Sequence, residues 1–310
     1  MVTQKKMSDT VFQILAVSAA IVSGVVNAVG YTVQRHVLLQ TTTRYLRKPV
    51  WWIGFALLII SEALGGFAFA LMPASVVVAL SSFSIVANAI FARFKEPPRL
   101  QVNLGSLCIL IGSVNLGMIT PIHSNSKDTE FFINALLTLE SVIYQLCVAF
   151  VCIVFHVYLF QWKHRQIILL ALYASLVSSI TALWFRPLVA VVVNGNWISL
   201  TDPLFYIALV IVAATGSYAA AFLEPAGLGT FLQSEWIPVH FVFCLLVFGI
   251  SGEIVFKDWY TSEETHSRVW IVLAHALTCI ICGVGLITRV EHESNTQRST
   301  SSPPSSASIT

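Results

Sequence analysis

The sequence predicts an all-α integral membrane protein with about nine transmembrane helices arranged as two inverted repeats. Of its 310 residues, 56% are apolar and only 10% are charged, and the mean hydropathy is +0.80, whereas a soluble domain carries about a quarter charged residues. Apolar runs long enough to cross a bilayer recur along the whole chain. The two halves of the chain also repeat a short pattern of residues. We therefore expect a lipid bilayer to surround this protein.

Nine apolar runs are the expected membrane spans, at residues 11–31, 50–72, 75–94, 101–120, 135–160, 166–186, 203–223, 228–256 and 268–288. The first run contains Ser23, Gly24 and Asn27. Small residues let helices approach closely, and Asn27 can hydrogen-bond across such a contact. The run is followed by YTVQRH, which places Gln34 and Arg35 at the membrane interface.

Two later runs carry features that shape their packing. The fourth contains Gly105, Gly112 and Gly117, which indicates close contact with another helix. The eighth is too long for one straight crossing, and Pro238 within it predicts a kink or an unwound turn.

These runs define the expected organisation of the chain: residues 1–10 form an N-terminal segment, 11–120 a first repeat of four helices, 121–134 a connecting loop, 135–288 a second repeat of five helices, and 289–310 a Ser/Thr/Pro-rich tail. The composition of the tail predicts disorder, because it cannot bury a core. Eleven of the 17 lysines and arginines fall in one set of loops, which the positive-inside rule assigns to the cytoplasm. The N-terminus is then outside and the C-terminus cytoplasmic.

A short pattern links the two halves, since Leu71-Met72-Pro73-Ala74-Ser75 is echoed by Leu223-Glu224-Pro225-Ala226-Gly227. Each Pro-Ala pair precedes an apolar run that ends in a charged pair, Lys95-Glu96 or Lys257-Asp258. We interpret Pro73 and Pro225 as structural elbows, together with Pro238. Nine spans place the two charged pairs on opposite sides, which is the inverted repeat of many secondary transporters, with the substrate site at mid-membrane. The alternative is coincidence, because Pro-Ala pairs and charged helix ends are common.

The predicted spans contain acids, which are costly in a membrane unless they serve a function. Glu62 and Glu235 lie deepest, so they are the first candidates for ion binding and for ligands of a transported metal. Glu140 is a third candidate, near the outer end of the fifth span, while Glu253 is expected to reach the headgroups. A protonated carboxyl group bonded to a neighbouring helix is the structural alternative for Glu62.

Amide side chains accompany these acids, and Asn27, Gln34 and Asn88 are the candidates for neutral ligands. Carboxylate and amide oxygens suit a hydrated divalent cation such as Mg²⁺. The same set would also suit protons or a polar organic solute, so the residue chemistry leaves these three substrate classes open.

Several other functions lack support in the sequence. No compact basic patch indicates nucleic-acid binding. The six cysteines all lie in apolar runs, where disulfide scaffolds and zinc sites are not expected. No nucleotide-binding, metalloprotease or hydrolase motif occurs, so neither an enzyme nor a cofactor is expected. The histidines at 156, 240 and 275 have apolar neighbours and are expected to be packing or interfacial residues.

Residues 51–96 resemble the signature of the NIPA-type magnesium transporters, a branch of the drug/metabolite transporter superfamily. The likeness is carried by Trp51-Trp52-Ile53-Gly54, Ser61-Glu62, Met72-Pro73-Ala74 and Lys95-Glu96. It continues in the second half, where SLVSSITALWFRP is similar to the family's sixth span and Pro238 and Lys257-Asp258-Trp259 hold matching places. The chain departs from the family pattern at Gly65-Gly66 and Ala79, and Glu235 is an added acid.

The resemblance implies a drug/metabolite-transporter-like fold that carries Mg²⁺ as its substrate. In this interpretation Glu62 attracts and partly dehydrates the ion, and Glu235 or Glu140 supplies the second acid. The resemblance further implies alternating access between the repeats, in a plasma or endosomal membrane, and a homo-oligomer is compatible with it. Two alternatives stay open: an organic-solute exchanger of the same superfamily, for a metabolite or nucleotide-sugar, and a non-transporting membrane scaffold that uses the Ser-rich tail.

Overall fold

The computed structural model describes residues 2–41, 44–71, 77, 80–93, 99–119, 129–161, 166–194, 202–256 and 274–289. Side chains are described from residue 14 onward, except at 69–71, 116–119, 129 and 193–194. Within these ranges every regular element is helical. The first half contains α1 (Val2–Gln40), a 3-10 turn (Tyr45–Arg47), α2 (Pro49–Leu71), α4 (Phe83–Ala92) and α5 (Leu100–Ile119). The second half contains α6 (Thr129–Leu136), α7 (Leu139–His156), α8 (Ile167–Asn194), α9 (Pro203–Tyr218), α10 (Glu224–Thr230), α11 (Gln233–Phe256) and a last helix, Ala274–Arg289.

Six described helical segments are long and apolar enough to cross a membrane, and three shorter apolar helices accompany them. The long segments are Ile14–Gln40, Pro49–Ala68, Leu139–Gln161, Ile167–Val192, Pro203–Thr230 and Gln233–Phe256. The shorter helices are Phe83–Ala92, Leu100–Asn115 and Ala274–Arg289. The chain is therefore a multi-pass, all-helical membrane protein, while nine crossings and two inverted repeats stay predictions.

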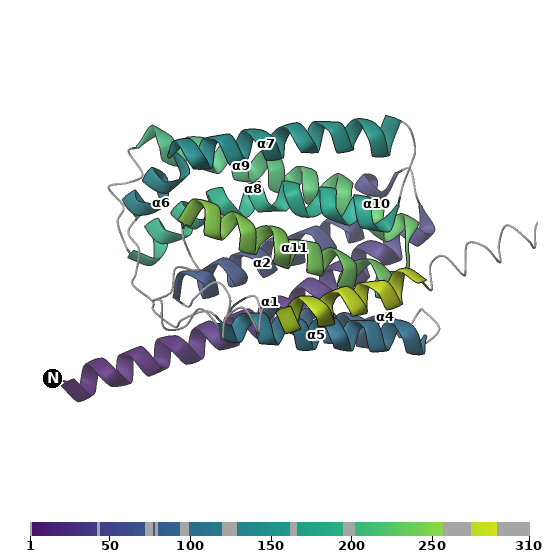
Figure 1. Cartoon of the computed structure of the whole chain (residues 1–310), viewed down its shortest axis with the longest axis horizontal. Coiled ribbons are helices and arrows are strands. Elements are labelled where there is room, and N and C mark those ends of the chain that lie inside the picture. Colours follow the sequence, from purple (N-terminus) through teal and green to yellow (C-terminus); the bar gives the residue numbers. More distant parts are fainter. Residues whose placement is uncertain are drawn as a thin grey trace, which may run out of the picture.

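The helices form one elongated bundle with α8 and α11 in its middle and α7 at one edge (Figure 1). Half of the most apolar window of α8 and of α11 is buried, against 11% for α7 and for Pro203–Thr230. In a membrane, exposed apolar side chains face lipid, so α8 and α11 are the central helices and α7 and α9 the peripheral ones. The first half joins this core where α1 contacts α10, α2 contacts α8, and α4 and α5 contact α11.

Local sequence explains several helix ends. The Thr138 side chain accepts a hydrogen bond from the Ser141 amide at the start of α7. Asp202 accepts from the Leu204 amide at the start of α9, where Pro203 occupies the first turn. Both are favoured N-terminal arrangements. Two π-helical segments, Val157–Gln161 and Ala219–Leu223, extend α7 and α9.

Two boundaries differ from the sequence-based expectation. α1 continues to Gln40, so Gln34 and Arg35 lie buried inside the helix rather than at a membrane interface. The long eighth run is broken at Phe231, whose backbone is extended (φ −112°, ψ 167°). The break therefore comes before Pro238, which lies inside α11.

Only some of the other predicted features lie within the described residues. Pro225 lies in the first turn of α10, and this helix follows directly on a π-helical segment. Pro73, Lys95-Glu96, Lys257-Asp258 and the tail from residue 290 lie outside the described residues. α6 begins within the range predicted as a connecting loop, most of which is also outside the described part.

Candidate functional site

Glu62 lies on the inward face of α2, yet its side chain is exposed. The helical repeat places it in one row with Trp51, Leu58 and Gly65, all of which are buried. A lipid-facing position would lie on the opposite side of the helix, where Ile53 and Ile60 are exposed. Ile59, which lies close to Glu62 around the helix, is also exposed, so Glu62 stands at the edge between the buried and the exposed faces of α2.

Glu224 is the acid that the structure brings near Glu62. It lies in the first turn of α10, and its side chain is buried. Glu62 interacts electrostatically with Glu224 and with His240 of α11. Two carboxylates that interact inside a membrane protein repel each other, so a cation that binds to both is favoured.

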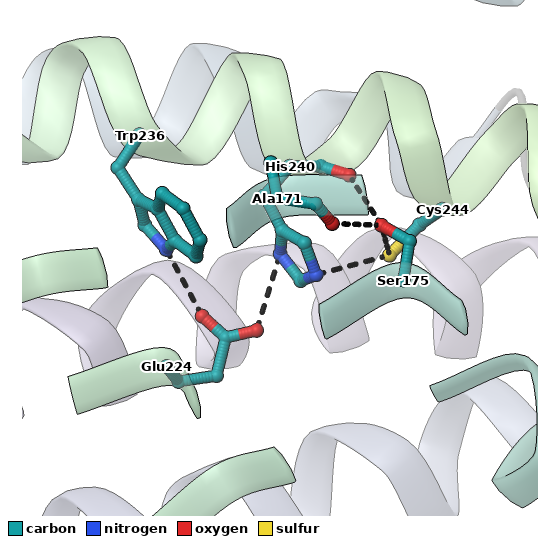
Figure 2. A network of polar contacts seen from close by, with 6 residues as sticks. All are labelled: Ala171, Ser175, Glu224, Trp236, His240 and Cys244. Atoms are coloured by element: carbon teal, nitrogen blue, oxygen red, sulfur yellow. Dashed lines mark hydrogen bonds and ion pairs between the residues drawn. The ribbon is translucent and has the colours of Figure 1, made fainter. Parts of the chain in front are cut away.

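Two side chains of α11 hold the Glu224 carboxylate, as Figure 2 shows. The Trp236 indole Nε1 donates to Glu224 Oε2 at 3.0 Å, and His240 Nδ1 lies 3.1 Å from Oε1. Trp236 is fully buried and stacks between Phe231 and His240, with ring-centroid distances of 6.2 and 5.4 Å. Both carboxylate oxygens are thus fixed relative to one helix.

The far side of His240 is anchored to α8. His240 Nε2 lies 3.2 Å from the Cys244 sulfur, which is 3.4 Å from Ser175 Oγ. The Ser175 hydroxyl also donates to the Ala171 carbonyl at 2.8 Å (Figure 2). The imidazole is therefore bonded on both sides, which fixes its orientation.

α1 contributes neutral groups to the same region. The Asn27 side chain hydrogen-bonds to Tyr31, which interacts electrostatically with both Glu62 and Glu224. Tyr31 is buried and belongs to the main hydrophobic core. α1, α2, α10 and α11 thus converge on two carboxylates, one phenol and one amide. We call Asn27, Tyr31, Glu62, Glu224 and His240 the acidic site.

Among the other candidates, Glu235 and Asn88 take part in a second cluster. Glu235 is buried and forms an ion pair with Arg99, at 2.8 Å. Asn88 is buried and exchanges hydrogen bonds with Gln233 of α11. Their part in ion binding stays a prediction.

The last two candidates lie apart from both clusters. Glu140 is exposed in the first turn of α7. Gln34 is fully buried against Gly54 of α2, and neither of its amide atoms has a hydrogen-bond partner in the described part of the chain. Their roles as a second acid and a neutral ligand are not tested by this arrangement.

Side-chain hydrogen bonds between the two halves gather at the end of the bundle where α10 lies, on the right in Figure 1. Arg35 Nη1 donates to the carbonyls of Leu228 and Phe231, at 2.8 and 2.6 Å. Gln233 Nε2 donates to Thr32 Oγ1 at 2.9 Å and to the Asn88 side chain. With the Arg99–Glu235 ion pair, these contacts make up what we call the inter-half cluster: Thr32, Arg35, Asn88, Arg99, Leu228, Phe231, Gln233 and Glu235.

Arg35 also satisfies a helix end, because Leu228 and Phe231 belong to the C-terminal end of α10, where carbonyls lack helical partners. Nearby, the Tyr45 hydroxyl donates to the Ala221 carbonyl at 3.0 Å. Partial burial raises the pKa of Tyr45 above its ordinary value, so the phenol keeps the proton that it donates.

No group of three or more His, Cys, Asp or Glu side chains suited to hold a metal occurs in the described ranges. Zinc-like sites are built from such groups. Mg²⁺ instead keeps several waters and uses one or two carboxylates. The acidic site therefore offers a donor set of the kind that suits a partly hydrated divalent cation.

Three members of the acidic site, Tyr31, Glu224 and His240, were given no role by the sequence. Glu224 stands beside Pro225 in the repeated Pro-Ala pattern, so the pattern itself could have singled it out. His240 was predicted to be a packing or interfacial residue, and no spacing in the sequence indicates that it faces Glu224.

The chain is similar to known proteins of one family. A family model described as "Magnesium transporter NIPA" matches residues 11–293. The mouse protein "Magnesium transporter NIPA4" is 28% identical over 231 residues, and its human counterpart is 27% identical. Both alignments cover 70% of this chain but only 54% and 55% of the relatives, so the chain spans about half of their length. The human "NIPA-like protein 2" is 22% identical over 92% of the chain and 76% of its own length.

No solved structure matches the chain at a significant level. The family match extends over nearly all of the described helices and includes every residue of the acidic site. This chain belongs to the magnesium transporter NIPA family.

Proposed function

We propose that this protein carries Mg²⁺ across a membrane. The observation that carries the proposal is the electrostatic interaction between the Glu62 carboxylate of α2 and the buried Glu224 carboxylate of α10. Family membership and the names of the relatives support Mg²⁺ as the ion. Mg²⁺ is expected as substrate, and no resident cofactor is needed.

Glu62 attracts the ion and displaces part of its water shell. Glu224 supplies the second carboxylate, a role that the sequence alone would give to Glu235 or Glu140. Asn27 and Tyr31 add neutral oxygens from α1, whereas the roles of Gln34 and Asn88 as neutral ligands stay predictions. Because Mg²⁺ dehydrates reluctantly, a site with two carboxylates and few other protein ligands binds it without trapping it.

Alternating access would require the inter-half cluster to open. Its contacts join α1, α4 and the start of α5 to α10 and α11 at one end of the bundle. Under the predicted topology this end is cytoplasmic, the N-terminus is outside, and nine spans form two inverted repeats. Rocking of one half against the other would then expose the acidic site on alternate sides.

The test is Mg²⁺ flux into proteoliposomes that contain a trapped fluorescent indicator. Glu62→Gln keeps the shape of the side chain and removes its charge, so we expect the flux to fall about tenfold or more, the effect of losing one charged interaction. Glu224→Gln is expected to reduce the flux as well. Glu140→Gln is the matched control because Glu140 is exposed outside the acidic site, and its flux should stay near that of wild type.

The same variants test which carboxylate acts with Glu62 as the second acid. Loss of flux in Glu140→Gln or Glu235→Gln, but not in Glu224→Gln, would contradict the role given to Glu224. Unchanged flux in Glu62→Gln would contradict the whole site. Folded wild-type protein without divalent flux, but with saturable uptake of an organic solute, would replace Mg²⁺ transport by the exchanger alternative.

A further inference from the structure

A polar recess lies between α4, α5 and α11, next to the inter-half cluster. It is partly open to its surroundings, and the space within it that water-sized molecules can occupy is about 20 Å³. Apolar residues such as Ile85, Val102 and Pro238 form part of its wall. Its polar lining comes from all three helices and from the residue before α5: Asn88, Arg93, Arg99, Asn103, Ser106 and Ser234.

The charge of this lining is positive. Arg93 is exposed at the end of α4 and forms no ion pair with any residue that the structure describes. Arg99 is partly exposed, with 32% of its side chain accessible, and pairs with Glu235. The recess therefore presents two guanidinium groups and, within the described chain, one partnering carboxylate.

The neutral part of the lining adds hydrogen-bonding groups to the two arginines. Asn88 and Ser106 are more than nine-tenths buried, at 1% and 7% exposure. α5 begins at Leu100, beside the recess, so the positive end of its helix dipole is close by. Guanidinium groups, hydroxyls, amides and a helix start are the groups that bind phosphate oxygens.

We propose that this recess binds a phosphate group, carried either by an anionic lipid headgroup or by a small soluble phosphate compound. Arg93 and Arg99 would bind the phosphate oxygens, and Asn103 and Ser106 would bond to the same group from α5. The predicted topology places the recess on the cytoplasmic side, where basic pockets between membrane helices meet anionic headgroups. This site differs from the acidic site in place, charge and ligand.

A bound phosphate would compete with Glu235 for Arg99. The ion pair between Arg99 and Glu235 joins α5 to α11 and belongs to the inter-half cluster. An anion that draws Arg99 toward the recess weakens this contact, and its own charge repels the Glu235 carboxylate. Occupancy of the recess would therefore loosen one of the contacts between the two halves.

The experiment measures thermal unfolding of the detergent-purified full chain during titration with three probes. Inorganic phosphate tests a free phosphate group, dioctanoyl phosphatidic acid tests a lipid phosphate, and dioctanoyl phosphatidylcholine is the zwitterionic control. A ligand that binds the folded state raises the unfolding temperature in a saturable way. We expect saturation with phosphatidic acid, or with both phosphate probes, and none with phosphatidylcholine.

Variants then localise the site. Arg93→Gln is expected to weaken binding about tenfold, as for loss of one charged hydrogen bond. Arg47→Gln removes an equally exposed arginine outside the recess and should bind like wild type. Asn103→Asp adds a carboxylate to the recess and should abolish binding, whereas Glu235→Gln removes the competitor for Arg99 and should strengthen it.

Each outcome of this experiment either supports or overturns the proposed phosphate site. Saturation with phosphatidic acid alone identifies the lipid as the source, and saturation with both probes identifies the phosphate group itself. The proposal is overturned if neither probe stabilises the protein, or if Arg93→Gln and Arg47→Gln respond alike. Because binding is read directly, the result does not depend on which ion the chain transports.

Discussion

Gly227 of α10 determines where the Trp236 indole can lie. A methyl group on Gly227 would overlap the ring atoms Cε2 and Cζ2 of Trp236. That ring is fully buried and stacked on both faces, so it cannot turn away. The glycine thus permits the close approach that brings the indole Nε1 to Glu224.

Gly227→Ala should therefore destabilise the protein by about 1–3 kcal/mol, the usual cost of overpacking a core. Gly229→Ala is the matched control on the same helix, because nothing lies within 4 Å of the added methyl group. It should be neutral or slightly stabilising, since alanine favours the helix. Unfolding of the two purified variants in one detergent provides the comparison, and equal stabilities would contradict this account of Gly227.

At the level of single residues, the sequence predicted some members of the acidic site and missed others. Glu62 and Asn27 could be found because an acid or an amide within an apolar run is conspicuous. The pairing of Glu224 with His240 could not be found, since it depends on how α10 folds back against α11. A long-range contact of this kind has no local signal.

At the scale of helices, α5 crosses the last helix at glycines. A methyl group on Gly283 would lie 2.5 Å from the carbonyl oxygen of Gly105, and one on Gly112 would lie 2.8 Å from that of Ala276. Such backbone contacts are typical of small residues at membrane helix crossings. The crossing confirms the close packing that Gly105 and Gly112 predict.

Gly283→Ala should force these helices apart, because the obstacle is backbone and cannot rotate away. We expect a loss of about 1–3 kcal/mol in stability and faster alkylation of Cys279, which lies at the crossing. Mass spectrometry of the alkylated peptide measures the second effect. Gly285→Ala meets no atom within 4 Å and should leave both quantities unchanged; equal effects in the two variants would argue against a tight crossing.

Helix ends were harder to predict than helix centres. The apolar runs located the described membrane helices, but they could not show that α1 continues to Gln40. Thr32 and Arg35 are polar and resemble a loop in sequence, yet both find partners on α10 and α11. Tertiary hydrogen bonds, rather than local propensity, extend this helix.

At the scale of the molecule, Arg35 ties the two halves together. Arg35→Gln removes a donor to two carbonyls at the end of α10. We expect amide hydrogen exchange in residues 224–231 to rise about tenfold, because a hydrogen bond from a charged group is worth about 1.5–3 kcal/mol. Hydrogen exchange with mass spectrometry measures this rate, and Arg47→Gln should leave it unchanged. Unaltered exchange in Arg35→Gln would show that the contact does not hold α10.

The arrangement of the helices relative to one another was the hardest feature to predict from the sequence. The sequence established a multi-pass helical protein and its family, since composition and motif likeness suffice for both. It could not establish which helices meet in the centre, because α8 and α11 are no more apolar than α7. The number of crossings and the inverted repeat remain predictions.

The two clusters share one rigid element. Gln233 and Glu235 of the inter-half cluster lie within the first eight residues of α11. So do His240 of the acidic site and Trp236, which donates to Glu224. A rotation or shift of this segment alters both sets of bonds together, because a helix does not bend freely over two turns. By reciprocity of linked equilibria, an ion that draws Glu224 away from α11 changes the strength of the inter-half contacts, and opening of those contacts changes the affinity for the ion by the same factor.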